Sequence, residues 1–316
     1  MHPVKIGIVG AGAMGCVYGG NLAEAGHEIW LLDVWREHID AMRTQGLHLS
    51  GASGDRVVPL NATTAADEIG PCRVVIIATK AADVEKAARN AGPLIAPETL
   101  VLAIQNGINN AQRAARHVEP RQLFIGIAEG FGASIAKPGH AHHHGWEMIH
   151  IGPYRSATSQ NLQDLEQMWH IAGFNVRIHN DIRPALWSKV VCNVAFSAIC
   201  TVTELKIGQV MANPHAWQIA TACAGEAAEV AGLKKIALPF QDSETWIRDF
   251  GRKIPGARPS MLLDLEAGKP SEVDSLNGAV ADEAEALGIQ APVNRLMTIL
   301  VKALEDRQRF LGTGWE

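Results

Sequence analysis

Three glycines near the start of the chain have the spacing of a phosphate-binding turn. Gly10, Gly12 and Gly15 follow the apolar run Lys5–Val9 and open a segment of helical spacing. The first glycine would allow a tight bend, the second a close approach to a pyrophosphate, and the third close packing of helix on strand. The helix start adds free N–H groups and positive potential. A dinucleotide site is therefore expected at Gly10, Ala11, Gly12, Ala13, Met14 and Gly15; a purely structural turn is the alternative.

Asp33 ends the second apolar run, 18 residues after Gly15. A carboxylate at this place accepts hydrogen bonds from the two ribose hydroxyls and repels a 2′-phosphate, so it favours NAD(H) over NADP(H). The alternative is an exposed acid at a strand end. Arg36, three residues later, could still fold back onto a phosphate.

Polar residues also follow two other apolar runs. Lys80 comes just after Val74–Ala78, and Asn106 follows Leu100–Ile104. Parallel strands gather ligands at their carboxyl ends, so both side chains could meet a ligand. A simple turn at Asn106 and plain solvation of Lys80 are equally compatible with the pattern.

A second candidate set lies in the C-terminal half. Lys189 and Asn193 are four residues apart within the apolar segment Ala185–Cys200, which places them on one face of a helix. The pattern fits either a site or a lysine that reaches solvent from a buried stem. Glu272 precedes another helical segment, where Ser271 and its neighbours could equally form a helix cap.

Four histidines gather at His140, His142, His143 and His144. In a strand the first, second and fourth would point to one face and His143 to the other. No carboxylate or thiolate is near in sequence to complete a metal site. We expect a surface strand or loop rather than a metal centre.

The order of apolar segments predicts an α/β fold followed by helices. Six runs read as strands: Lys5–Val9, Glu28–Asp33, Val74–Ala78, Leu100–Ile104, Phe124–Ala128 and Met148–Gly152. Their alternation with helical segments indicates a mostly parallel sheet. From Ala185 onward the apolar spacing is helical, with prolines 184, 214, 239, 255, 270 and 292 expected between the helices. We predict two domains, 1–181 and 182–316.

Composition narrows the class of protein. The chain has 316 residues, 47% of them hydrophobic, and a net charge of −5 without a basic block, which argues against a nucleic-acid partner. The N-terminal residues lack a signal-peptide pattern, and no run of about 18 uninterrupted apolar residues occurs, so we expect a cytoplasmic protein without a membrane span. The five cysteines have no Cys-x-x-Cys spacing and are expected to be reduced core thiols.

Together these segments resemble the ketopantoate reductases (2-dehydropantoate 2-reductases). The resemblance covers the whole chain and is carried in order by Gly10–Gly15, Ala78–Lys80, Gln105–Gly107, Lys137–His140, Leu186–Lys189 with Asn193, Ser260–Asp264 and Glu272–Gly278. It implies an N-terminal Rossmann-type domain and an all-α C-terminal domain like that of 6-phosphogluconate dehydrogenase. It also implies hydride transfer between a nicotinamide cofactor and a branched 2-oxo acid.

The resemblance assigns two residues to the chemistry. Lys189 would be the general acid that protonates the developing alkoxide, and Glu272 would orient the lysine and the substrate. An ammonium in a dry cleft suits an oxygen that gains negative charge, and a carboxylate partner favours the charged lysine.

Binding roles follow in the same way. Asn106 would lie near the nicotinamide ribose or the substrate, and Lys80 near the cofactor ribose. Asn193 would hydrogen-bond the substrate, Ser260 would hold its carboxylate, and Ser197 would take a substrate-binding position.

The chain departs from the family pattern at three positions. Val34 stands where many members have an arginine for the 2′-phosphate, although Lys80 keeps NADP(H) open. Ser197 replaces a second asparagine, and Ala257 replaces an asparagine three residues before Ser260. Fewer groups remain to recognise a pantoate hydroxyl.

Three functions stay open. Ketopantoate reduction leads, followed by an NAD-dependent D-2-hydroxyacid dehydrogenase acting on 2-oxoisovalerate- or mandelate-like acids. A dinucleotide-sensing protein without catalysis is the third.

The apolar stretch Leu296–Leu304 could pair two copies as a homodimer.

Overall fold

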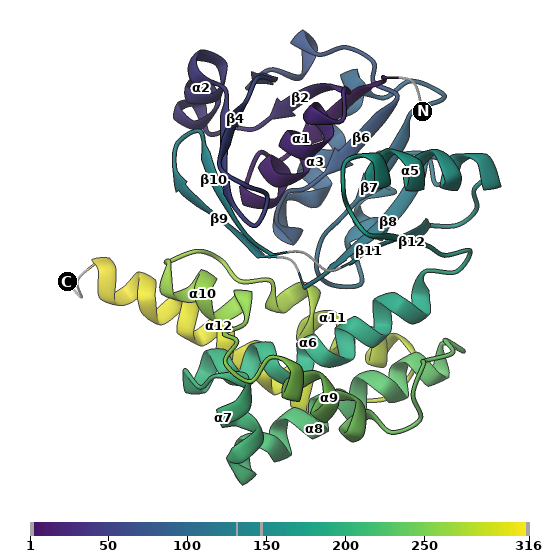
Figure 1. Cartoon of the computed structure of the whole chain (residues 1–316). Coiled ribbons are helices and arrows are strands. Elements are labelled where there is room, and N and C mark those ends of the chain that lie inside the picture. The colour runs from purple at the N-terminus through teal and green to yellow at the C-terminus, as the bar shows by residue number, and fades with distance from the viewer. Residues whose placement is uncertain (1–2, 131, 146–147, 314–316) are drawn as a thin grey trace. The chain divides into compact units, whose positions relative to one another are not determined.

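The computed structural model describes residues 3–130, 132–145 and 148–313 (Figure 1). Two compact units make up the chain. Unit 1 consists of Met1–Gln105 and Asn110–Ile182, and unit 2 consists of Asn106–Asn109 and Arg183–Glu316. The short segment Asn106–Asn109 thus belongs with the helices, although it directly follows a strand region of unit 1.

Unit 1 is built on an eight-stranded sheet in the order β12-β11-β8-β7-β6-β1-β2-β5. All six predicted strands are present. The strands are β1 (Lys5–Val9), β2 (Glu28–Leu32), β5 (Asn61–Thr63), β6 (Val74–Ile77), β7 (Leu100–Ala103), β8 (Leu123–Glu129), β11 (Met148–Pro153) and β12 (Val176–Ile178). The pairing is parallel except between β8 and β11. The prediction of a mostly parallel sheet is therefore confirmed.

Helices cover both faces of this sheet, which explains why its strands are apolar on both sides. Ile6 and Ile8 of β1 pack into the cluster formed with three helices, α1 (Ala13–Glu24), α2 (Arg36–Gln45) and α5 (Ser159–Ile171). Val9, on the opposite face, packs with α3 (Val84–Asn90) and α4 (Asn110–Ala114). Each such fully buried aliphatic side chain contributes about 1.5–3 kcal/mol.

A second sheet, which the sequence did not indicate as such, packs on the α1 face in the order β4-β3-β10-β9. Its strands are β3 (Leu47–Gly51), β4 (Arg56–Val58), β9 (Gly132–Lys137) and β10 (His140–Gly145). These strands are short and carry few apolar residues in alternation, so hydrophobic spacing does not reveal them.

The histidine cluster lies on β10, and serine hydroxyls contact it. Ser50 Oγ is 2.7 Å from His140 Nε2, and Ser53 Oγ is 2.6 Å from Nδ1 of the buried His143. Burial lowers the pKa of both His140 and His143 below the ordinary value. Within the described ranges no group of three His, Cys, Asp or Glu residues is arranged to hold a metal ion.

Unit 2 is helical, and its described residues after Arg183 contain no strand. Its helices are α6 (Arg183–Thr203), α7 (Ile207–Ala212), α8 (Pro214–Leu233), α9 (Ser243–Lys253), α10 (Ser260–Glu266), α11 (Asn277–Ala286) and α12 (Pro292–Thr313), drawn from teal-green to yellow in Figure 1. The prediction that prolines separate the helices is wrong for Pro184, Pro214 and Pro292. They lie in the first turn of a helix, where the missing N–H has no intrahelical partner to lose.

Helix α6 forms the centre of unit 2. By length and composition it is the one helix of the described chain that could cross a membrane, with a mean hydropathy of 1.5, but 78% of that stretch is buried within the structure. Helix α6 is therefore apolar because it is buried in the core of unit 2. All five cysteines are buried thiols outside any disulfide, as predicted, and burial raises the pKa of Cys72 to about 11 and that of Cys200 to about 12.

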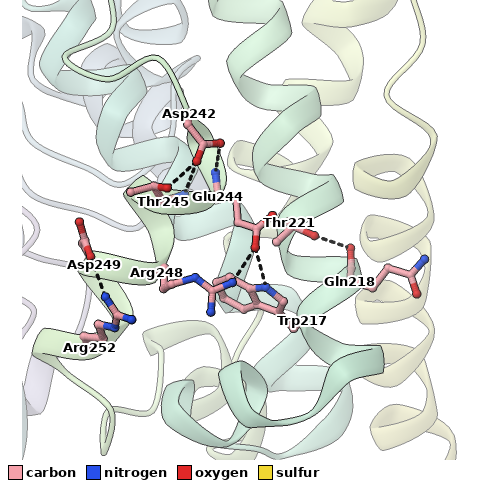
Figure 2. Close-up of polar contacts among 9 residues, drawn as sticks. All are labelled: Trp217, Gln218, Thr221, Asp242, Glu244, Thr245, Arg248, Asp249 and Arg252. Carbon is pink, nitrogen blue, oxygen red and sulfur yellow. Dashed lines mark hydrogen bonds and ion pairs between the residues drawn. The ribbon is translucent and has the colours of Figure 1, made fainter.

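Helix α9 is joined to α8 by a polar and aromatic cluster, shown in Figure 2. Glu244 accepts hydrogen bonds from Trp217 Nε1 at 3.2 Å and from Arg248 at 2.6 Å, and the Arg248 guanidinium lies 4.6 Å from the Trp217 ring centre. Asp242 caps α9 by accepting from the backbone N–H groups of Glu244 and Thr245. The hydrogen bonds from Thr245 hold the pKa of the Asp242 carboxyl below its usual value.

Candidate active site

The glycine turn between β1 and α1 has the geometry that its sequence predicts. Gly10 has a φ of +101°, and a Cβ at Gly15 would lie 2.0 Å from the Gly10 carbonyl oxygen, so both positions require glycine. A Cβ at Gly12 would meet nothing within 4 Å. Gly12 also has no side chain to cap α1. The turn therefore offers open space at the N-terminus of a 12-residue helix, as a bound pyrophosphate needs.

Asp33 is held beside this turn by two backbone N–H groups. Its Oδ2 accepts from Ala11 N at 2.7 Å, and its Oδ1 accepts from Trp35 N at 3.0 Å. The carboxylate is thus directed toward the glycine turn. Val34, the next residue, is 82% exposed, and Arg36 begins α2 on the surface.

Two side chains that sequence reasoning passed over carry buried polar atoms near the strand ends. Thr79 Oγ1 and Gln105 Oε1 are buried, and neither atom has a hydrogen-bond partner among the described residues. Both residues follow central strands, β6 and β7, at the edge where such folds bind ligands. A buried polar atom without a partner is costly, so these two atoms suit a bound polar group. Their place directly after buried strands is the signal that could have found them.

These features fit a nicotinamide dinucleotide. Gly12 leaves room for phosphates, while Asp33 faces the turn and could accept from ribose hydroxyls. Lys80 is exposed at the N-cap of a 3-10 helix, η2 (Ala81–Asp83), directly after Thr79.

In unit 2, three predicted site residues form one hydrogen-bonded chain. Lys189 Nζ donates to Asn106 Oδ1 at 2.9 Å, and Asn106 Nδ2 donates to Glu272 Oε2 at 3.1 Å. Glu272 is 7% exposed, and Lys189 is half-buried. The charges leave the amide one orientation, because an ammonium needs an acceptor and a carboxylate needs a donor. The amide of Asn106 thus connects the Lys189 ammonium to the Glu272 carboxylate.

Three separate backbone segments supply this chain. Helix α6 carries Lys189, and Glu272 precedes a 3-10 helix, η4 (Val273–Ser275). The loop Asn106–Asn109 rests on η4, since Ile108 N donates to the Ser275 carbonyl oxygen at 3.3 Å. A Cβ at Gly107, whose φ is +98°, would lie 2.2 Å from that oxygen, so the contact requires glycine.

The sequence left open whether Ser271 and Glu272 form a helix cap or part of a site, and the two residues differ in this respect. Ser271 Oγ accepts from Val273 N at 3.3 Å, whereas the Glu272 side chain makes no cap hydrogen bond and reaches Asn106 instead.

The remaining predicted residues lie on two helices of unit 2. Asn193 and Ser197 follow Lys189 at four and eight residues along α6, so they share its helix face; Asn193 is half-buried and Ser197 is buried. Ser260 is the exposed first residue of α10, and Ala257 lies shortly before it. Among the described residues, the hydrogen bonds that join Lys189, Asn106 and Glu272 do not include Ser260.

Comparison with known proteins identifies the family. The sequence model for Ketopantoate reductase PanE/ApbA matches residues 6–156, and the model for its C-terminal part matches residues 181–305. The chain belongs to the ketopantoate reductase family. It is therefore an enzyme of the oxidoreductase class that acts on a CH–OH group or the corresponding oxo group, with a nicotinamide cofactor.

Relatives and solved structures cover nearly the whole chain. A PanE/ApbA family ketopantoate reductase from Ralstonia eutropha JMP134 is 33% identical, with a TM-score of 0.88, over 97% of this chain and 100% of that one. D-mandelate dehydrogenase, solved with NADH and anilino(oxo)acetate, is 25% identical with a TM-score of 0.89, over 96% and 98%. The 2-dehydropantoate 2-reductase of Archaeoglobus fulgidus is 28% identical over 97% of this chain and 99% of the relative.

The glycine turn leads to a test that separates binding from folding. Gly12→Ala should leave the melting temperature within about 2 °C, because the backbone at Gly12 is extended (φ −64°, ψ −175°) and the space beyond it is open. It should raise the dissociation constant of the nicotinamide dinucleotide at least about 10-fold, because the methyl group occupies the approach of the pyrophosphate. Calorimetric titration and a thermal melt measure both quantities.

Gly225→Ala is the matched control, since a Cβ on this α8 residue also meets nothing within 4 Å. A folded Gly12→Ala variant that binds the dinucleotide as tightly as Gly225→Ala would show that this turn does not hold the pyrophosphate.

Proposed function

We propose that this protein is an NADH-preferring reductase of a branched 2-oxo acid, with ketopantoate as the leading substrate. The observation that supports it most is the hydrogen-bonded chain of Lys189, Asn106 and Glu272. A protein that only sensed dinucleotides would have no need of a half-buried ammonium connected to a buried carboxylate. In this proposal residues 1–181 hold the cofactor and residues 182–316 supply the acid and the substrate contacts.

Lys189 supplies the proton in the proposed reaction. A dihydronicotinamide cofactor held at the glycine turn and Asp33 would supply a hydride to the carbonyl carbon. As the carbonyl oxygen gains negative charge, Lys189 Nζ donates a proton to it, and the ketone becomes a secondary alcohol. The Asn106 carbonyl oxygen holds the ammonium in place, and Glu272 holds the Asn106 amide from the other side. Asn193, Ser197 and Ser260 serve as substrate contacts.

The choice of oxo acid depends on Ser197 and Ala257. Ser197 is buried on the Lys189 face of α6, and Ala257 is half-buried with its carbonyl oxygen accepting from Ile207 N at 3.1 Å. Neither offers the amide that would pair with a pantoate hydroxyl. The likeness to D-mandelate dehydrogenase favours an oxo acid without that hydroxyl as the second candidate.

The choice of cofactor depends on the charge at the end of β2. Asp33 faces the glycine turn, Val34 offers no charge, and Glu37 adds a second carboxylate, which accepts from Trp35 Nε1 at 3.3 Å. At an intermediate dielectric, two like unit charges 4 Å apart cost about 4 kcal/mol. Arg36 and Lys80 are both exposed, where one ion pair contributes about 1 kcal/mol or less. Repulsion of a 2′-phosphate therefore exceeds its attraction.

Cellular setting and assembly complete the proposal. Five buried thiols that form no disulfide suit a reducing compartment, and we place the enzyme in the cytoplasm. Helix α12 exposes Leu296, Ile299 and Leu300, which supports a homodimer through this helix. The net charge of −5 supports a small-molecule substrate over a nucleic acid. Turnover of a panel of 2-oxo acids with NADH and NADPH tests the proposed function as a whole.

Lys189→Ala should lower kcat by roughly 10²–10⁴-fold, because the proton donor is lost, while the dissociation constant of the cofactor stays near that of the wild type. Steady-state kinetics and fluorescence titration measure these quantities. Lys253→Ala, which removes an exposed lysine at the end of α9, is the control and should keep full turnover. Equal turnover of the two variants would remove Lys189 from the mechanism.

The wild-type enzyme should discriminate weakly between ketopantoate and its analogue without the hydroxyl. A site without the two amides that would pair with the hydroxyl is expected to separate them by about 10²-fold or less in kcat/KM. Ser197→Asn combined with Ala257→Asn should increase that ratio. A wild-type preference for ketopantoate of about 10⁴-fold or more would contradict the assignment of these two positions.

NADH should give the higher kcat/KM in the wild type, and Asp33→Ala combined with Val34→Arg should shift the preference toward NADPH. Dissociation constants measured by fluorescence titration should follow the same order. Asp40→Ala, which removes an exposed carboxylate elsewhere on α2, changes the net charge without touching the glycine turn and should leave the preference unchanged. Tighter binding of NADPH than of NADH by the wild type would refute the role given to Asp33.

A further inference from the structure

Asn277, a buried amide, follows the proposed catalytic residue Glu272 in the chain. Asn277 is the first residue of α11, five residues after Glu272, and none of its surface is exposed. Its neighbours include the apolar core of unit 2, where a buried polar group is costly, and its Oδ1 has no hydrogen-bond partner among the described residues. The Asn277 side chain therefore needs a structural or functional reason.

The amide of Asn277 connects α11 to the helix that carries Lys189. Asn277 Nδ2 donates to the Val194 carbonyl oxygen at 3.2 Å and to Asn294 Oδ1 at 2.9 Å. Val194 follows Asn193 on α6. The hydrogen bond thus joins the backbone of α6, within two turns of Lys189, to the start of the helix that follows Glu272 and η4.

A second layer of polar groups sets the orientation of this amide. Asn294, also fully buried, donates through Nδ2 to the Cys223 carbonyl oxygen at 3.0 Å and to Glu226 Oε2 at 2.7 Å. Glu226 also accepts from Val293 N and Asn294 N, each at 2.9 Å, and so caps the start of α12. With its NH₂ group committed to these acceptors, Asn294 turns its oxygen to Asn277, and Asn277 must then present its own NH₂ group.

The loop with Asn106 depends on the same turn. Ile108 N donates to the Ser275 carbonyl oxygen of η4, two residues before Asn277. Asn277 therefore holds α6 to η4, and η4 in turn holds the loop Asn106–Asn109. All three residues of the hydrogen-bonded chain stand on segments that this one amide brings into register.

We propose that Asn277 is a positioning residue for the reaction, which keeps Lys189 within hydrogen-bond reach of Asn106 and Asn106 within reach of Glu272. The proposal rests on the proposed function for its kinetic consequence. A displacement of about 1 Å at catalytic groups can lower turnover about 100-fold, so loosening this register should act on kcat more than on binding.

Asn277→Ala is the first variant to measure, with Val280→Ala as the matched control. Val280 is fully buried one turn further along α11 in the same core, so its truncation destabilises the helix without touching the amide. Both variants should melt at a lower temperature than the wild type. Asn277→Ala alone should lower kcat, by on the order of 10- to 100-fold, with KM for the oxo acid changed less than about threefold. The dissociation constant of the cofactor should not change.

Asn277→Ser provides a variant that keeps the fold if Asn277→Ala does not. Serine is well tolerated at a helix start, where its hydroxyl can serve local N–H groups, yet it is too short to keep both contacts of the amide. The same loss of kcat is expected. A kcat for the Asn277 variants within twofold of Val280→Ala would overturn the proposal.

Hydrogen exchange measured by mass spectrometry decides the question without turnover. Exchange in the segments 104–110 and 183–197 should be faster in the Asn277 variants than in Val280→Ala, by about 10-fold. Equal exchange in these segments would overturn the positioning role. Wild-type protein that turns over no oxo acid in the panel would refute the proposed function alone, since the exchange comparison is independent of it.

Discussion

Glu272 keeps 7% of its surface exposed, and a carboxylate so removed from water must find hydrogen-bond donors inside the protein. Asn106 is one such donor, and by giving its NH₂ group to Glu272 it turns its oxygen toward the Lys189 ammonium. One buried charge thus sets the orientation of an amide, and the amide holds a cation. The loop Asn106–Asn109, the turn η4 and helix α6 must all be correctly placed, because otherwise the buried Glu272 carboxylate loses its hydrogen-bond partner.

Unit 1 separates its stability from its chemistry along each strand. Ile6, Ile8 and Val9 pack into the hydrophobic cores on the two faces of the sheet. Polar side chains therefore lie at the ends of the strands. Asp33 and Gly10 follow β2 and β1, while Thr79 and Gln105 follow β6 and β7. Thr79 Oγ1 and Gln105 Oε1 are buried without a partner among the described residues, so they suit a bound polar group at this edge.

Unit 2 buries a polar network where a helical core usually has aliphatic side chains. Glu226, Asn294 and Asn277 are connected in one sequence of donors and acceptors that ends on the backbone of α6. In an interior of low dielectric, hydrogen bonds between such groups are stronger than in water. A network of this kind specifies one register between helices that apolar packing alone would leave adjustable, and the proposed chemistry needs that register.

Local spacing is enough to predict the glycine turn, the six main strands, and the shared helix face of Lys189 and Asn193, because all of these depend on near neighbours along the chain. The histidine strand and its sheet escape such reasoning, since β3 and β10 pair across about 90 residues with little apolar alternation. The partners of Asn106 are 83 and 166 residues away, and its membership in the helical unit is invisible in the sequence. Asn277 stands within a recognisable motif, but its contacts with Val194 and Asn294 arise only when α6, α11 and α12 pack together. Hydrogen bonds between distant segments depend on burial and side-chain direction, and packing creates both.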